Sequence, residues 1–164
     1  MAPSSPDCEA MEDSSIRPYA LNAGEGWTYN YGIDFTVLLG ERRHGHGVAI
    51  VQYQTRRGED PPDHTHETED ESFFVLSGSL TFRCGEETFD VESGGFVFLP
   101  HGIEHGYTIR TDDDVDLLVV TSPAPEEGVP TGRGWGGFIA DLEASGELRT
   151  SPPHLTLSKR FNLP

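Results

Sequence analysis

Short apolar and aromatic runs alternate with breaks that contain Gly, Pro or Asp from residue 17 onward. Runs of this length at close, even spacing are typical of the strands of an all-β sandwich or barrel. No apolar repeat at helical spacing occurs before residue 130. The pattern predicts strands at residues 18–21, 27–31, 33–39, 48–54, 72–76, 80–83, 88–91, 96–99, 105–109 and 115–121.

The two ends of the chain differ from this middle part. The first 16 residues mix Pro, Ser, Asp and Glu without periodic apolar positions, which is typical of a disordered tail. Phe138, Ile139 and Leu142 share one face at helical spacing, which predicts a short helix over residues 135–144. At 164 residues the chain is expected to hold one domain. The predicted parts are a disordered acidic tail (1–16), a β-barrel (17–123), and a C-terminal loop, short helix and tail (124–164).

The chain is strongly acidic, with a net charge of -17 and Lys159 as its only lysine. Nucleic-acid surfaces need clustered basic side chains, so no nucleic-acid partner is expected, and anionic membrane surfaces are disfavoured for the same reason. No apolar run approaches the ~20 residues of a membrane span, and the N-terminus lacks the basic and apolar regions of a signal peptide. Because Cys8 and Cys84 suit no disulfide framework, a cytoplasmic protein is expected.

The strongest candidate chemistry lies in residues 58–78, which read GEDPPDHTHETEDESFFVLSG. His64 and His66 are two positions apart, so on an extended strand both rings face the same side. Glu71 stands before the apolar run SFFVL, and a turn over residues 67–70 would bring its carboxylate beside the two rings. Two neutral nitrogens and one carboxylate oxygen form a facial site that leaves metal positions open, as in non-haem iron and other catalytic metal sites.

A second stretch supplies a further nitrogen. Residues 94–109 read GGFVFLPHGIEHGYTI, which combines a strand, a Pro-His-Gly turn and a histidine at the start of the next strand. That histidine, His105, would be the third nitrogen ligand.

The first stretch resembles the first motif of the cupin superfamily at every spacing. Gly58 is followed after five residues by His64-x-His66, after four more by Glu71, and after six more by Gly78.

The second stretch resembles the second cupin motif. Gly94 is followed after five residues by Pro100-x-Gly102 and after two more by His105. The family's asparagine is absent, and Ile109 stands in its place. That position is not a metal ligand in the family, so the absence of the asparagine does not change the expected metal site.

The resemblance implies a single cupin jelly-roll β-barrel, also described as a double-stranded β-helix. It implies one divalent transition metal (Fe, Mn, Ni, Cu or Zn) held by His64, His66, Glu71 and His105. It further implies that the protein pairs into a homodimer through its sheets.

Other side chains compete for these roles. Glu69 and Asp70 miss the family spacing for the carboxylate, so both are expected to be loop charges. The second His-x-His pair, His44 and His46, has no carboxylate at a suitable distance. His101 lies in the Pro-x-Gly turn and is expected to be an exposed turn residue rather than a base.

The expected activity follows from the resemblance to small bacterial monocupins, which include quercetinase-like dioxygenases and cupin cyclases of aromatic polyketide pathways. It implies a dioxygenase acting on an enolic or phenolic small molecule, with Glu71 as both metal ligand and base. Two alternatives use the same residues: a cyclase or isomerase with the metal as Lewis acid, and a non-catalytic cupin that binds a small molecule. Tyr107 has the same strand parity as His105, and Phe73 and Val75 have the same parity as Glu71, so these three are expected to point into the barrel. Together with Tyr53, one of several aromatic residues concentrated in and around the motifs, they are expected to line the substrate pocket.

Overall fold

The fold is described by a computed structural model for residues 18–40, 48–123 and 147–150. These ranges contain strands and turns and no helix, which confirms the all-β prediction. The strands are β1 (Trp27–Tyr31), β2 (Ile33–Leu39), β3 (Ala49–Thr55), β4 (Glu69–Ser77), β5 (Ser79–Cys84), β6 (Glu87–Glu92), β7 (Phe96–Leu99), β8 (His105–Ile109), β9 (Val115–Pro123) and β10 (Glu147–Thr150).

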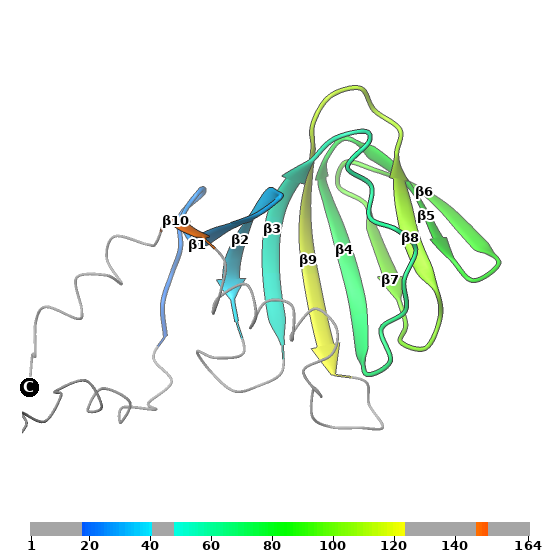
Figure 1. Cartoon of the computed structure of the whole chain (residues 1–164), viewed down its shortest axis with the longest axis horizontal. Helices are drawn as coiled ribbons and strands as arrows, with labels where there is room; N and C mark the ends of the chain where they lie inside the picture. Colours follow the sequence, from blue (N-terminus) through cyan, green and yellow to red (C-terminus); the bar gives the residue numbers. More distant parts are fainter. Residues whose placement is uncertain (1–17, 41–47, 124–146, 151–164) are drawn as a thin grey trace, which may run out of the picture.

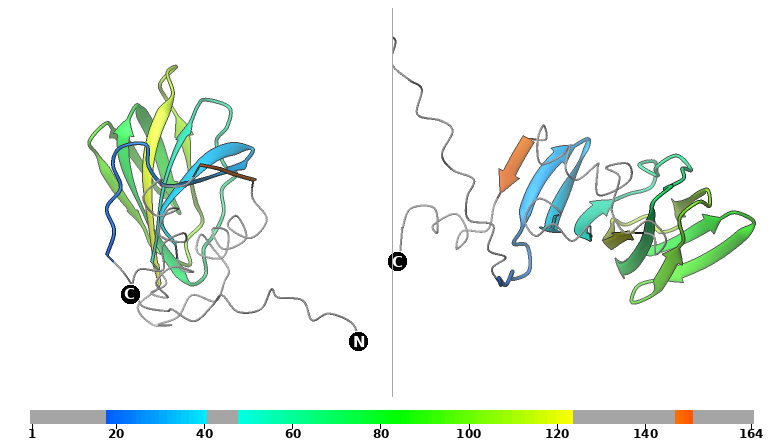
Figure 2. Two further views of the ribbon diagram at one scale, coloured as in Figure 1. Left: turned by 90° about the vertical axis from the view of Figure 1, so that its left-hand side faces the viewer. Right: turned by 90° about the horizontal axis from the view of Figure 1, so that it is seen from below.

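Two antiparallel sheets make up the domain (Figure 1). One sheet has seven strands in the order β10-β1-β2-β3-β9-β4-β7, and the other has three in the order β6-β5-β8. The right-hand view of Figure 2 shows the strands following one another from β10 (orange) to the green hairpin of β5 and β6. This arrangement is consistent with the jelly roll.

The core lies between the inner faces of the two sheets. Alternate residues of β9 and β3 are buried, as the period of two along a strand requires. Phe73 on β4 packs against Phe82 on β5 and Tyr107 on β8, with ring centroids 5.2 Å and 6.0 Å apart. Burial of an aromatic or aliphatic side chain contributes about 1.5–3 kcal/mol, so these contacts hold the two sheets together.

Strand β4 begins earlier than the sequence predicted. It starts at Glu69, because β9 extends to Pro123 and pairs with these extra residues. The prediction that Glu69 and Asp70 are loop charges is therefore wrong. The side chain of Glu69 is fully buried on the same face of the strand as Glu71, and Asp70 is half-buried on the other face.

Two further differences concern the edge of the large sheet. Residues 18–21 form no strand; instead, the Tyr19 ring packs edge-on against Trp27, and its hydroxyl donates to the Leu38 carbonyl over 2.5 Å. Strand β10 was not predicted, because its four residues are all exposed and show no alternation. It forms by pairing with β1. The predicted helix, both tails, His44 and His46 lie outside the described residues.

The outer face of the large sheet carries exposed aromatic side chains. Phe74 on β4 and Phe96 and Phe98 on the edge strand β7 are 42%, 51% and 50% exposed. The predicted homodimer through the sheets stays a prediction, and this face is its natural candidate. Among the described residues, no helix combines the length and the apolar character needed to cross a membrane.

Candidate metal centre

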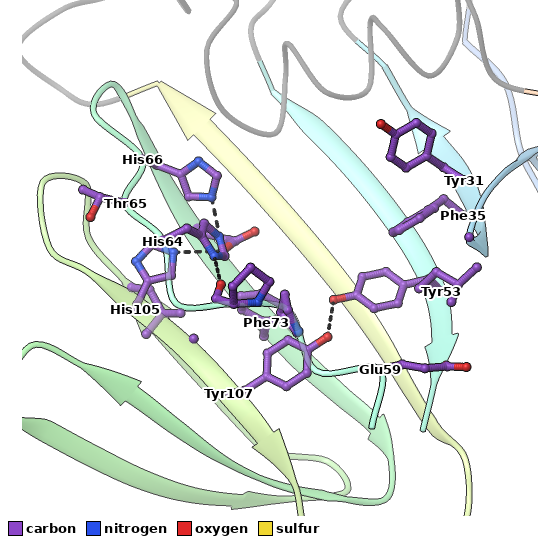
Figure 3. Close-up of a pocket in the computed structure, with 17 residues that line it drawn as sticks. Tyr31, Phe35, Tyr53, Glu59, His64, Thr65, His66, Phe73, His105 and Tyr107 are labelled. Atoms are coloured by element: carbon purple, nitrogen blue, oxygen red, sulfur yellow. Dashed lines mark hydrogen bonds and ion pairs between the residues drawn. The ribbon is translucent and has the colours of Figure 1, made fainter. Parts of the chain in front are cut away.

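Four side chains from three parts of the chain converge at one end of the barrel. His64 and His66 come from the segment between β3 and β4, Glu71 from β4, and His105 from the start of β8. One ligand atom from each of the four lies within 4.8 Å of the others. The His64 ring centroid is 4.9 Å from those of both His66 and His105, and Figure 3 shows the three rings gathered together.

Backbone hydrogen bonds hold the two histidine segments against each other. His64 and His105 form an isolated antiparallel bridge, with N–H to carbonyl distances of 2.9 Å and 2.8 Å in the two directions. The Gly102 amide donates to the His66 carbonyl over 2.8 Å. The segment before β4 therefore extends the small sheet at β8, which places both of its rings beside His105.

The ring orientations direct a nitrogen lone pair into the cluster. Nδ1 of His64 lies 2.9 Å from the Pro62 carbonyl, and Nδ1 of His105 lies 2.9 Å from the Ile103 carbonyl. Because a carbonyl only accepts, each Nδ1 carries the proton and donates, and Nε2 keeps its lone pair. This second hydrogen bond is typical of histidines that bind metals.

Four polar atoms at the centre of the cluster are buried without hydrogen bonds. Nε2 of His66, Nε2 of His105 and both carboxylate oxygens of Glu71 have no hydrogen-bond partner among the described residues. Leaving such a group unsatisfied costs about 1–3 kcal/mol, and more when it is charged. A divalent metal would bind the two nitrogens and a Glu71 oxygen, together with His64, so the residues present fit a metal ion.

The electrostatics favour the ionised carboxylate. Burial raises the pKa of Glu71, but the nearby imidazoles of His105 and His66, whose Nε2 atoms lie 3.3 Å and 3.7 Å from its Oε2, outweigh it and leave the pKa below its ordinary value. Burial lowers the pKa of His105, but Glu71, whose Oε2 lies 3.3 Å from the Nε2 of His105, leaves it raised. Glu71 is therefore an anion at neutral pH, ready to bind a cation.

Metal affinity is expected to decrease as the pH falls, because imidazole must be neutral to bind a metal. The raised pKa of His105 keeps its proton to a higher pH than an ordinary histidine, so competition begins somewhat above pH ~6.5 and strengthens below it. The lowered pKa of Glu71 keeps that ligand ionised over the same range. Chelator competition with zinc from pH 8 to pH 5 measures this, and an affinity that stays flat would contradict histidine ligation.

An ion pair fastens the His64 segment to the small sheet. Asp63 accepts a hydrogen bond from Nη2 of Arg83 over 2.5 Å, and Nη1 of Arg83 donates to Thr108 over 2.8 Å. The hydrogen bond that Asp63 accepts from Arg83 keeps the pKa of Asp63 below its ordinary value. The Asp63 carboxylate lies directly against Gly106, where a Cβ atom would collide with it. Close packing at a glycine therefore sets the position of the residue next to His64.

Asp63→Ala is expected to weaken metal binding by on the order of tenfold, because it loosens the support of His64 without removing a ligand. The matched control is Asp90→Ala, which removes an ion pair to Arg110 (3.2 Å) on the same sheet, outside the cluster. Zinc dissociation constants of both variants check this. If Asp63→Ala bound zinc as tightly as Asp90→Ala, the backbone bridge to His105 alone would hold His64 in place.

The cluster lies in the wall of a cavity of about 820 Å³. Tyr53, Phe73 and Tyr107, three of the four residues expected at the pocket, line it. Val75 does not, because its position two residues beyond Phe73 carries it away from the cluster into the core. The full lining consists of Tyr31, Gly32, Ile33, Phe35, Tyr53, Glu59, Pro61, Pro62, His64, Thr65, His66, Glu71, Phe73, Leu99, His105, Gly106 and Tyr107.

Two tyrosine hydroxyls meet inside this cavity. The Tyr53 and Tyr107 oxygens are 3.1 Å apart, and Figure 3 shows both side chains reaching toward each other. Burial raises the pKa of Tyr107 to about 12, and burial together with Tyr107 raises that of Tyr53 well above its ordinary value. Both hydroxyls stay protonated at neutral pH, so neither is suited to act as a base there.

His101 does not join the cluster or the cavity lining. It is a half-exposed turn residue whose Nδ1 lies 2.7 Å from the Asp70 carboxylate, and its amide donates to the same oxygen over 3.0 Å. This pair links the turn after β7 to β4, next to Glu71.

Comparisons with known proteins place this geometry in context. A family model described as a cupin domain matches residues 52–121. The quercetin 2,3-dioxygenase of Bacillus subtilis (strain 168) is 26% identical over 100 residues, which cover 60% of this chain but only 29% of that enzyme. An uncharacterized protein of Streptomyces coelicolor is 32% identical over 86 residues, which cover 52% of this chain and 76% of the relative.

A solved structure shows the same fold. The Cnp3 cupin domain of Schizosaccharomyces pombe superposes with a TM-score of 0.54 at 18% identity, covering 62% of this chain and 75% of that one.

Proposed function

The chain belongs to the cupin family, and on this premise we propose that it is a metal-dependent dioxygenase acting on a neutral enolic or phenolic small molecule. The observation that carries the proposal is the set of buried ligand atoms of His66, Glu71 and His105 that lack hydrogen bonds in the wall of a large cavity. Apolar cavities with a few convergent polar groups are the usual form of small-molecule sites.

The cavity lining supports a neutral, planar substrate. The described residues that line it include no lysine or arginine. A dicarboxylate could place one carboxylate on the metal, but the other would be buried with no cationic side chain in this lining to pair with it, which is costly. Tyr31, Phe35, Tyr53, Phe73 and Tyr107 instead offer aromatic surface to a flat ring system.

His64, His66 and His105 would hold the metal through Nε2, with Glu71 as the fourth ligand. When bound, the metal supplies a Lewis acid for an enol or phenol oxygen and, if it is Fe, Mn, Ni or Cu, the redox capacity that a reaction with dioxygen needs. The similarity to the quercetin 2,3-dioxygenase supports this choice, although the chain spans only 29% of that enzyme's length.

Glu71 has two oxygens and therefore fits two tasks. One oxygen can serve the metal, while the other accepts the hydroxyl proton of the substrate. The lowered pKa of Glu71 means that the carboxylate is ionised before the substrate arrives. Phe73 and Leu99, both buried and lining the cavity, exclude water around this proton transfer.

The test is metal analysis of the purified protein followed by oxygen-uptake assays with a panel of flavonols. Oxygen consumed in proportion to flavonol supports the dioxygenase. Substrate conversion without oxygen uptake would instead identify the cyclase or isomerase alternative, and binding without conversion the non-catalytic alternative.

A further inference from the structure

The cavity contains two separate groups of buried polar atoms. One is the metal-binding cluster, and the other is the hydroxyl pair of Tyr53 and Tyr107. Tyr53 comes from β3 in the large sheet and Tyr107 from β8 in the small sheet. Their hydrogen bond therefore joins side chains that extend from the two sheets toward each other. Phe35 and Phe73, which also line the cavity, offer only apolar surface. A ligand that fills the cavity would therefore meet buried polar partners at two places, in addition to the exposed Tyr31, Glu59 and Thr65 of the lining.

The tyrosine pair keeps capacity for a further hydrogen bond. A hydroxyl has one donor and two acceptor positions. The Tyr107 oxygen uses one of these three toward Tyr53. At least one acceptor position therefore remains on Tyr107, and its proton is also available whenever Tyr53 is the donor of the pair. A ligand hydroxyl fits both cases, because it donates and accepts.

The pair is held in place by aromatic packing on both sides. Phe35 packs on Tyr53 with ring centroids 5.1 Å apart, and Phe82 packs on Tyr107 with ring centroids 5.6 Å apart. Both tyrosines are at least nine-tenths buried. The hydroxyls are thus fixed before a ligand enters, and fixed hydrogen-bonding groups lower the entropic cost of binding.

We propose that the Tyr53–Tyr107 pair is a second anchor, which binds a phenolic hydroxyl of the substrate away from the oxygen that faces the metal. This rests on the proposed function and narrows its substrate class to planar aromatic compounds with hydroxyls on more than one ring. A simple enol with a single oxygen would leave the anchor unused. The cavity of about 820 Å³ is of the size that holds such multi-ring ligands.

The test compares two ligands that share the enolic hydroxyl. Quercetin carries additional phenolic hydroxyls on its outer rings, whereas 3-hydroxyflavone carries none. Dissociation constants are measured by fluorescence titration on the full chain loaded with zinc, which has no redox chemistry. The wild-type protein is expected to bind quercetin about tenfold more tightly than 3-hydroxyflavone, as one well-placed hydrogen bond allows.

Tyr107→Phe is expected to abolish that preference while binding 3-hydroxyflavone almost as tightly as the wild-type protein. Tyr53→Phe is expected to reduce it. The matched control is Tyr19→Phe, which removes a hydroxyl bonded to the Leu38 backbone outside the cavity and should leave the preference intact. A preference that survives in Tyr107→Phe, or a wild-type protein that binds the two flavonols equally or not at all, overturns the anchor. Retained discrimination in the zinc-loaded protein, together with no oxygen uptake by protein loaded with Fe, Mn, Ni or Cu, would contradict the proposed oxidation and leave the anchor supported.

Discussion

Replacing His66 with alanine is expected to lower the affinity for the metal by at least ~100-fold. The loss of an outer-shell partner already costs about 10–100-fold, and His66 would contribute a ligand atom itself. The same result is expected for His105→Ala, since both Nε2 atoms face the Glu71 carboxylate, at 3.7 Å and 3.3 Å. Metal content after dialysis, determined by mass spectrometry, checks the prediction.

The folded barrel should survive these substitutions. The hydrophobic core between the sheets does not include either histidine, so circular dichroism should stay close to that of the wild-type protein. His101→Ala is the matched control, because its ring is half-exposed and bonded to Asp70 outside the cavity. Stoichiometric metal in both His66→Ala and His105→Ala would show that the site is wrongly assigned.

Glu71→Gln is expected to retain much of its metal and to turn over at least ~100-fold more slowly. Glutamine keeps the shape and one oxygen donor, but it cannot accept a proton. General-base contributions are typically about 10²–10⁴-fold, whereas three histidine nitrogens remain to hold the metal. Turnover per bound metal, measured on variants loaded to equal occupancy, separates the two roles of Glu71.

The neighbouring carboxylate provides the control for this comparison. Asp70→Asn removes a charge one residue away that bonds to His101, and its turnover should fall far less. Near-normal turnover of metal-loaded Glu71→Gln would refute the base role. If that variant lost its metal as fully as His66→Ala, Glu71 would be chiefly a structural ligand, and another group would have to accept the proton.

Local patterns were enough to locate the cluster in the sequence. The spacing of His64, His66 and Glu71 is short, and the following strand fixes which side of the chain Glu71 faces. His105 is distant in sequence from the other three residues of the cluster. It begins strand β8, and Tyr107, two positions further on, faces the same side of that strand and lines the cavity. The strands at 27–31, 33–39, 96–99 and 105–109 were predicted with their observed bounds, because their apolar runs end at clear turn signals.

Features that depend on which strands become neighbours could not be read from the chain. Glu69 is buried because β9 continues beside it, and nothing local to Glu69 signals this. Phe35 reaches the cavity because β2 pairs with β3 and places it opposite Tyr53. The contact of Asp63 with Gly106 likewise depends on the docking of the His64 segment onto β8.

The most direct test of the metal centre is anomalous diffraction from crystals of the full chain, collected at the absorption edge of the metal found by elemental analysis. The structure predicts one strong anomalous peak within about 2.0–2.3 Å of Nε2 of His64, His66 and His105 and of one Glu71 oxygen. A metal peak elsewhere in the molecule, or no peak at these four atoms in protein that carries stoichiometric metal, would contradict it.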